Sequence, residues 1–236
     1  MIKLALRPAL LASIGVLALT ACQEGAAPPA APETATEVAA EEPVGEIDIK
    51  LPQMVCGPDG FVQRDDTRES LAARFGAENI TEEDLPWVDS TETALVLFPD
   101  EPATRAELFW LDKTSGGSVY VRVGGENSQW IGPGGLYIGA SLADVEAANG
   151  GPFEMMGFEN HNSGEVVDWL GGTFAAKPGD TCEFAMALGL PADAATEVIA
   201  PVSGDPGKIY RSDSAEIRAA NPSVDVLAVQ FFEQPR

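Results

Sequence analysis

Short apolar stretches alternate with polar and glycine-rich segments between about residue 46 and residue 232. Two segments, 67–76 and 141–150, share one pattern: a hydroxyl residue, three residues, Leu or Val, one residue, Ala, two residues and Gly. A hydroxyl residue is a typical helix N-cap, and glycine is a typical residue at a helix end. Each segment therefore predicts a short helix with one apolar side, beginning after Thr67 or Ser141.

The two predicted helices differ in their first turns. A capping box pairs the N-cap hydroxyl with a side chain three residues later, where an acid is favoured. Asp144 stands at that position in the second helix, and Ser70 stands there in the first. Gly76 and Gly150 suit the left-handed backbone that stops a helix.

Strand patterns follow each predicted helix. Alternation of apolar and polar residues predicts strands at 93–98, 106–111 and 118–123 in the first half and at 166–170, 182–188 and 226–232 in the second. A short helix is also predicted at 214–220, ended by Asn221-Pro222. The predicted fold class is α+β, with two tandem repeats of a short helix followed by an antiparallel β-meander, at 46–130 and 131–236.

The amino-terminal residues predict a secretion signal over residues 1–21. Lys3 and Arg7 precede an uncharged apolar run at 9–19, which is too short for a membrane span of about 20 residues. The run ends in Leu-Thr-Ala-Cys22, which resembles the lipobox of bacterial lipoproteins. The alternative is an ordinary signal peptide with an unrelated cysteine, but the coincidence of run and motif favours lipidation of Cys22.

The lipobox also implies a location in the cell envelope. In the lipoprotein family an Asp after the cysteine retains the protein in the inner membrane, and this chain has Gln23. The resemblance therefore implies an outer-membrane protein, lipid-anchored on the periplasmic face. Residues 22–45 form a predicted disordered tether of Ala, Pro, Glu, Thr and Val, because they offer too little apolar surface to fold.

The charge balance limits the partners that the chain can bind. The sequence has 14 Lys and Arg against 37 Asp and Glu, a net charge of −23. Loss of Lys3 and Arg7 with the leader leaves 12 basic residues and a charge of −25. Such a surface repels phosphate backbones, so no nucleic-acid partner is expected. The charge serves solubility in one interpretation and attracts a basic partner in another.

Three cysteines occur in the sequence. With Cys22 assigned to the lipid, Cys56 and Cys182 remain as an even pair in an oxidising compartment, which predicts a disulfide. The alternative is a free catalytic thiol, which the single histidine of the chain, His161, makes less favourable. A cross-link over so long a loop stabilises by roughly 4 kcal/mol.

A resemblance to known proteins begins at Gly139-Ala140-Ser141. With 150–153 (Gly-Gly-Pro-Phe), 157–158 (Gly-Phe) and 166–169 (Val-Val-Asp-Trp), this segment resembles one in uncharacterised Gram-negative lipoproteins. More distantly, the helix-and-meander repeat is similar to the β-lactamase-inhibitor protein and to the small lipoprotein of the outer-membrane β-barrel assembly machine. Those proteins bind other proteins, so the resemblance implies a binding module. The resemblance implies no particular contact residue in this chain. The first half also departs from the pattern, because it lacks the Pro-Phe after Gly76-Ala77.

Catalytic and metal-binding motifs are not recognisable in the chain. His161 lies in a polar loop sequence, and no Gly-x-Ser-x-Gly segment or phosphate loop is present. The acidic clusters at 82–84 and 100–101 lack the spacing of a calcium loop. No cofactor and no metal are predicted, and a hydrolase that uses paired carboxylates remains an alternative function.

Aromatic residues supply the candidate binding positions. Trp130 lies beside the glycines at 132–135, where an exposed indole would suit a binding surface, although the interpretation that it covers the core is favoured. Trp87 and Tyr137 are the other candidates. The predicted function is a lipid-anchored, periplasm-facing module that binds an envelope protein or component without catalysis. An inhibitor of a basic enzyme such as lysozyme, and a purely structural envelope role, are alternatives.

Overall fold

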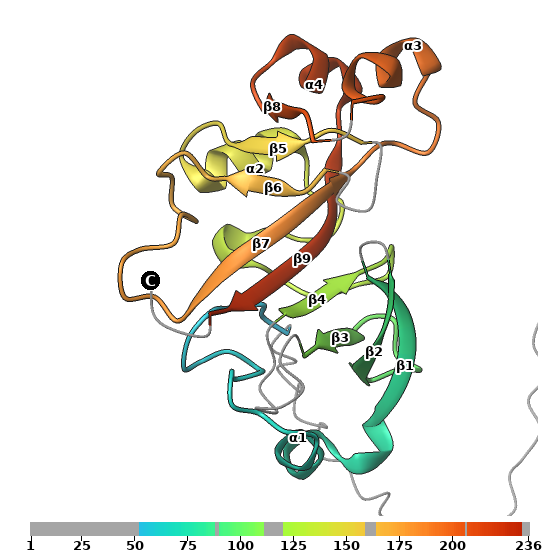
Figure 1. Ribbon diagram of the computed structural model, residues 1–236, viewed down its shortest axis with the longest axis vertical. Helices are drawn as coiled ribbons and strands as arrows, with labels where there is room; N and C mark the ends of the chain where they lie inside the picture. The colour runs from blue at the N-terminus through green and yellow to red at the C-terminus, as the bar shows by residue number, and fades with distance from the viewer. Residues whose placement is uncertain (1–51, 88–89, 111–119, 159–163, 206, 233–236) are drawn as a thin grey trace, which may run out of the picture. The chain divides into compact units, whose positions relative to one another are not determined.

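The computed structural model describes residues 52–87, 90–110, 120–158, 164–205 and 207–232 (Figure 1). All of these residues belong to one compact unit, Asp48–Arg236. The predictions for the leader, the lipidated Cys22, the tether and His161 lie outside the described residues.

The two predicted helices begin at the predicted residues. Helix α1 spans Arg68–Phe75 and helix α2 spans Leu142–Asn149, and each N-cap hydroxyl accepts a hydrogen bond from the backbone N–H three residues later. Both capping boxes are complete, because the Ser70 hydroxyl takes the part that Asp144 plays in α2. The bonds from Ser141 lower the pKa of the Asp144 carboxyl.

The ends of these helices differ. Gly150 has φ 83° and ψ 15°, the left-handed geometry expected of a helix stop, and its N–H bonds to carbonyls of α2. Gly76 has φ 90° but ψ 136°, so it turns the chain out of α1 through an extended backbone conformation. A positive φ favours glycine at both positions.

A six-stranded antiparallel sheet organises the unit, in the order β1-β2-β3-β4-β9-β7. Its first four strands form a meander: β1 (Ile80–Trp87), β2 (Ser90–Leu97), β3 (Ala106–Phe109) and β4 (Tyr120–Gly124). The other two are β7 (Cys182–Gly189) and β9 (Ser223–Phe231). Because β4 pairs with β9, strands from both halves of the chain belong to one sheet.

The second half adds a small three-stranded sheet and two more helices. Strands β5 (Glu154–Met156), β6 (Val166–Asp168) and β8 (Ile209–Arg211) pair in the order β6-β5-β8. Helix α3 spans Thr196–Ile199, and helix α4 spans Ala215–Ala220. As predicted, α4 ends before Asn221, which is left-handed; Ser214, predicted as the first helical residue, is its N-cap.

The α+β class is confirmed, but two tandem repeats are not. After α1 the chain makes a true meander, whereas after α2 it distributes its strands between two sheets. The last strand, β9, inserts between β4 and β7, so the strands of the second half do not pair in chain order. The long connection that carries β8 and α4 between β7 and β9 makes this arrangement feasible.

One hydrophobic core joins the two halves. Strand side chains alternate between the faces of a sheet, and one face of the large sheet presents buried apolar residues from every inner strand. They include Leu95, Leu108, Val121 and Val229, and the border strand β7 adds Phe184 on the same face. Leu71 of α1 and Val145 of α2, both fully buried, belong to the same core cluster.

The predicted disulfide is present. Cys56 and Cys182 are bonded, with their Cα atoms 5.8 Å apart and 126 residues between them in sequence. The bond ties the segment before α1 to the first residue of β7. Nearby, the Met54 N–H donates to the carbonyl of Ile131 at 2.8 Å, and the Met54 side chain is buried. The amino-terminal segment is therefore attached to the core by both a covalent bond and packing.

Candidate functional site

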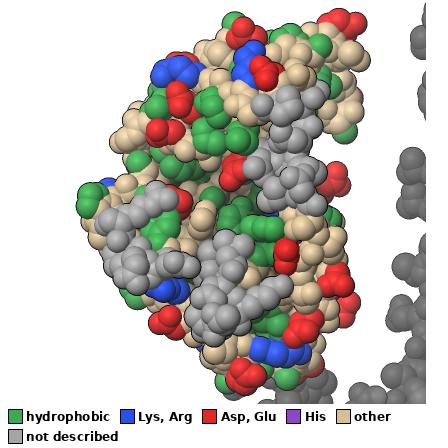
Figure 2. All heavy atoms as spheres, in the orientation of Figure 1, with side chains coloured by type: hydrophobic (Ala, Val, Ile, Leu, Met, Phe, Trp, Pro, Cys, Tyr) green, Lys and Arg blue, Asp and Glu red, His purple; other side chains and the backbone are tan. Residues whose placement is uncertain are grey.

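The second face of the six-stranded sheet carries charged side chains, in contrast to the apolar face. Glu107 on β3 lies opposite Arg122 on β4, and Glu83 on β1 and Arg105, just before β3, lie on the same side. We call this the outer face. Figure 2 shows carboxylates and cations distributed over part of the molecular surface in the orientation of Figure 1.

Four of these side chains form an alternating ion-pair network. Arg105 donates to both carboxylate oxygens of Glu83, at 3.3 Å and 2.7 Å, and one of its Nη atoms lies 3.3 Å from Glu107. The Nε of Arg122 donates to the second oxygen of Glu107 at 2.6 Å. The bonds from Arg105 lower the pKa of the Glu83 carboxyl, and Glu83 raises the pKa of Arg105 in turn. The network fixes two guanidinium groups on the outer face.

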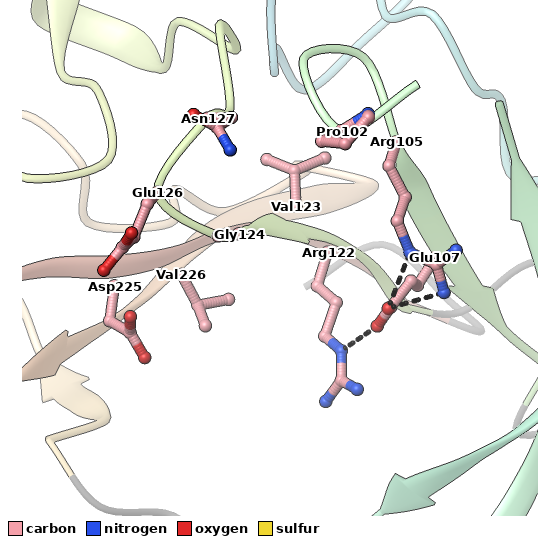
Figure 3. Close-up of a pocket in the computed structure, with 11 residues that line it drawn as sticks. Pro102, Arg105, Glu107, Arg122, Val123, Gly124, Glu126, Asn127, Asp225 and Val226 are labelled. Atoms are coloured by element: carbon pink, nitrogen blue, oxygen red, sulfur yellow. Dashed lines mark hydrogen bonds and ion pairs between the residues drawn. The ribbon is translucent and has the colours of Figure 1, made fainter. Parts of the chain in front are cut away.

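A pocket of about 430 Å³ opens at one end of this network, beside the start of β3, the end of β4 and the start of β9 (Figure 3). It is lined by Pro102, Arg105, Glu107, Arg122, Val123, Gly124, Gly125, Glu126, Asn127, Asp225 and Val226. We call it the charged pocket. Two arginines and three acids contribute to its lining, so it can contact both signs of charge.

The two signs are arranged on different sides of the pocket. Figure 3 shows Arg105, Glu107 and Arg122 together on one side of Gly124, and Glu126 and Asp225 together on the other. Both of the latter carboxylates are exposed to solvent, and within the described part of the chain neither has an ion pair. The arginine side of the pocket is therefore internally neutralised, whereas the opposite side presents net negative charge.

Glycine at position 124 allows the two walls to approach. A Cβ atom there would lie 3.0 Å from the backbone carbonyl oxygen of Asp225, which is closer than a side chain normally packs. Gly125 has φ 89° and turns the chain after β4. The glycine pair thus brings Glu126 next to the strand that carries Asp225.

An aromatic cluster adjoins the network on the outer face. The Arg122 guanidinium lies 4.7 Å from the centre of the Phe109 ring, and the Trp87 ring lies 4.4 Å from the same ring. Tyr120 meets Trp87 edge to face at 5.1 Å. Burial, together with the charge of Glu165, raises the pKa of the Tyr120 hydroxyl. Trp87, a predicted binding residue, therefore lies on the same face as the charged pocket and is half-buried.

Trp130 requires a correction. Its side chain is only 2% exposed, so it is not available to a partner. Polar neighbours in sequence suggested exposure, but Phe61 packs on the indole at 4.3 Å. The indole N–H donates to the carbonyl of Arg105 at 3.2 Å, so Trp130 supports a residue that lines the charged pocket. Tyr137 is 51% exposed, and within the described residues no contact joins it to the pocket.

The segment from Gly139 to Trp169 has a structural role. The Asn149 side chain is buried and donates to the carbonyls of Gly151 and Trp169 while accepting from the Phe174 N–H. Phe153 is buried beside Trp169, whose indole N–H donates to the carbonyl of Phe184. The motif is therefore explained by helix ending and packing, without any need for a binding role.

The charged pocket itself was not predicted. Its polar residues come from the β2–β3 connection, strands β3 and β4, the turn after β4 and the start of β9, which are far apart in sequence. The alternation at 118–123 did place Arg122 on the polar face of its strand, but nothing in the sequence paired it with Glu107. Trp87 was the single predicted residue that the structure places on the outer face.

The described residues contain neither a clustered metal site nor a helix that could span a membrane. Among them, no group of three or more His, Cys, Asp or Glu side chains is placed to hold a metal ion. No helix in the described ranges has the length and apolar character needed to cross a membrane. No family model, curated protein or solved structure matches the chain.

Proposed function

We propose that this chain is a lipid-anchored protein of the outer membrane, facing the periplasm, whose folded unit binds another protein or an envelope component. The observation that carries the proposal is the charged pocket. Fixed guanidinium groups, two carboxylates without ion pairs among the described residues, and exposed turn backbone meet there around one opening. These are groups that recognise a partner through charge and hydrogen bonds.

The size and exposure of the pocket favour a macromolecular partner. A volume of about 430 Å³ lies at the lower end of the range for small-ligand sites, which usually enclose most of their ligand. Here the lining acids are exposed, and the half-buried Trp87 extends the same face. A side chain of a docked protein would fill the pocket while the rest of its surface covers the outer face.

In-cell crosslinking followed by affinity capture tests this function. The full-length chain is compared with Cys22→Ser, which cannot be anchored, and with the double variant Glu126→Lys/Asp225→Lys. The matched control is Glu216→Lys/Asp193→Lys, which makes the same charge change at exposed positions elsewhere. One dominant envelope component is expected with the wild type and the control, and its loss is expected with the pocket variant. Equal capture by all anchored forms would refute the role of the pocket.

An inhibitor of a basic enzyme is a specific version of this function. The processed chain carries a charge of −25, and the acidic side of the charged pocket could accept a Lys or Arg side chain. Binding to lysozyme should then weaken as salt rises, because exposed charges are screened within about 8 Å at physiological ionic strength. Binding that is independent of salt, or no binding, would exclude this version.

A carboxylate hydrolase is the second candidate, since Glu126 and Asp225 both line the pocket. Glycosidases hold one acid protonated by burying it, whereas both of these carboxylates are exposed. Hydrolysis of cell-wall glycan by the purified protein, lost in both Glu126→Gln and Asp225→Asn, would establish this candidate in place of the binding module.

A further inference from the structure

Strand β1 forms one border of the six-stranded sheet. All eight of its residues pair with β2, and among the described strands none pairs with its other side. Figure 1 shows β1 as the outermost strand of the meander. An edge strand exposes one row of backbone donors and acceptors, which is a template for a further strand.

The ladder shows which backbone groups face outward. The Phe98 N–H donates to the Asn79 carbonyl at 2.8 Å, just before the first residue of β1. In an antiparallel pair, residues that bond to the partner alternate with residues whose N–H and C=O point away. Glu82 and Asp84 therefore direct their backbone groups to the open side. Pro86 belongs to the same outward set, where its missing N–H breaks no bond to β2.

A hollow lies beside this edge on the apolar face of the sheet. Its volume is about 590 Å³, and it lies between the first turn of α1 and strands β1 and β2. Its lining includes Leu95, which is buried, Trp110, and Glu82, whose carboxylate pairs with Arg68 at 3.0 Å. A strand added to β1 would have space for an apolar side chain in this hollow.

We propose that an extended segment of a basic partner adds to β1 as a seventh strand. This inference deepens the proposed binding function and rests on it. The charges of the edge select the partner: Glu82 and Asp84 lie toward one face of the sheet and Glu83 toward the other. Glu82 and Glu83 already pair with Arg68 and Arg105, so Asp84 is the edge carboxylate without an ion pair among the described residues. An added strand would place its side chains next to these carboxylates, which favours Lys or Arg, above all beside Asp84.

Charge also decides against two other occupants. A second copy of the chain would bring β1 against β1 and set acidic residues beside acidic residues, which is destabilising. The tether of this chain is similarly unsuitable, because residues 22–45 contain Glu and no Lys or Arg. A basic segment from another molecule is the occupant that the edge favours.

The test uses the full-length protein in detergent and two eight-residue peptides, one of alternating Lys and Val and one of alternating Glu and Val. Hydrogen exchange is measured along β1. The Lys peptide is expected to slow exchange at Glu82 and Asp84 by about tenfold, because a new strand bonds to those amides. The Glu peptide is expected to leave exchange unchanged. Equal effects of both peptides, or protection only outside β1, would overturn the proposal.

Two variants test separately the contribution of an outward backbone N–H and the contribution of the acidic side chains. Glu82→Pro removes an outward N–H without removing a bond to β2, and it should weaken binding of the Lys peptide about tenfold. Glu82→Lys/Asp84→Lys should reverse the preference toward the Glu peptide. Intrinsic Trp fluorescence of each variant checks that the fold is kept. A folded proline variant that binds as well as the wild type would show that β1 serves only as a protected edge.

The outcomes for the edge and for the pocket are distinguishable. If the Lys peptide protects β1 but in-cell capture yields no partner, the edge can accept a strand and the proposed function fails. If capture depends on Glu126 and Asp225 but not on the β1 variants, the function holds and strand addition is rejected.

Discussion

The two faces of the six-stranded sheet are built from neighbouring residues of the same strands but have different chemistry. On β3, Leu108 is fully buried in the core, and the adjacent Glu107 joins Arg105 and Arg122 on the outer face. The apolar face holds the fold together through burial, whereas the outer face holds charges in fixed positions at little net gain in stability. Substitutions on the two faces should therefore affect different properties.

Loss of the disulfide is expected to cause the largest decrease in the free energy of unfolding. Cys182 is buried at the start of β7, and the bond closes a span of 126 residues. Replacing both Cys56 and Cys182 by Ala should lower the free energy of unfolding by about 4 kcal/mol. Denaturant unfolding followed by Trp fluorescence measures this. A loss below about 1 kcal/mol would show that packing alone fixes the amino-terminal segment.

Leu108→Ala should cause the next largest loss of stability. The side chain is fully buried, so its truncation leaves a cavity and costs about 3 kcal/mol of unfolding free energy. Binding of the partner should be unchanged in the fraction that remains folded. Chemical denaturation and capture on the same preparation test both statements, and a small stability loss with lost capture would reverse the assignment of the faces.

Glu107→Gln should reduce partner binding more than it reduces stability, the opposite of Leu108→Ala. Glu107 lies between Arg105 and Arg122, and removing its charge should cost only about 1 kcal/mol because the network is partly exposed. Partner binding should fall more steeply, since both guanidinium groups lose the carboxylate that positions them. Parallel measurements of unfolding and binding decide between this outcome and a purely structural role.

The smallest expected effect is the pH dependence contributed by Glu83. Arg105 lowers the pKa of this carboxyl in the folded chain, so its stabilising effect is present above the ordinary value of 4.5 and is lost as pH falls below it. The wild type should lose up to about 1 kcal/mol more than Glu83→Gln between pH 6 and pH 3. Identical pH profiles of the two proteins would contradict the assigned pairing.

The elements that depend on local chemistry could be predicted from the sequence. The N-cap hydroxyls Thr67 and Ser141 and the αL residue Asn221 act within one helix turn, so their effect is visible in a short window. The sequence did not predict strand β1, because its Asp and Glu residues and Pro86 are unfavourable in a central strand. They are tolerated here because β1 lies at the edge of the sheet.

Features that depend on long-range pairing could not be predicted. The position of β9 between β4 and β7 is set by contacts across the whole unit, and it brings Asp225 to the charged pocket. The burial of Trp130 depends on Phe61, which lies far away in sequence and is brought close by the disulfide-linked segment. Neither contact leaves a periodic signal around the residue concerned.

The most direct test of the charged pocket as a recognition site is site-specific photo-crosslinking in living cells. A photoreactive residue replaces Asn127, which lines the pocket and is exposed, or Asp193, which is exposed elsewhere. The binding account predicts an adduct with one envelope component from position 127 and none from position 193. The absence of any adduct at 127, or the same adducts from both positions, would contradict it.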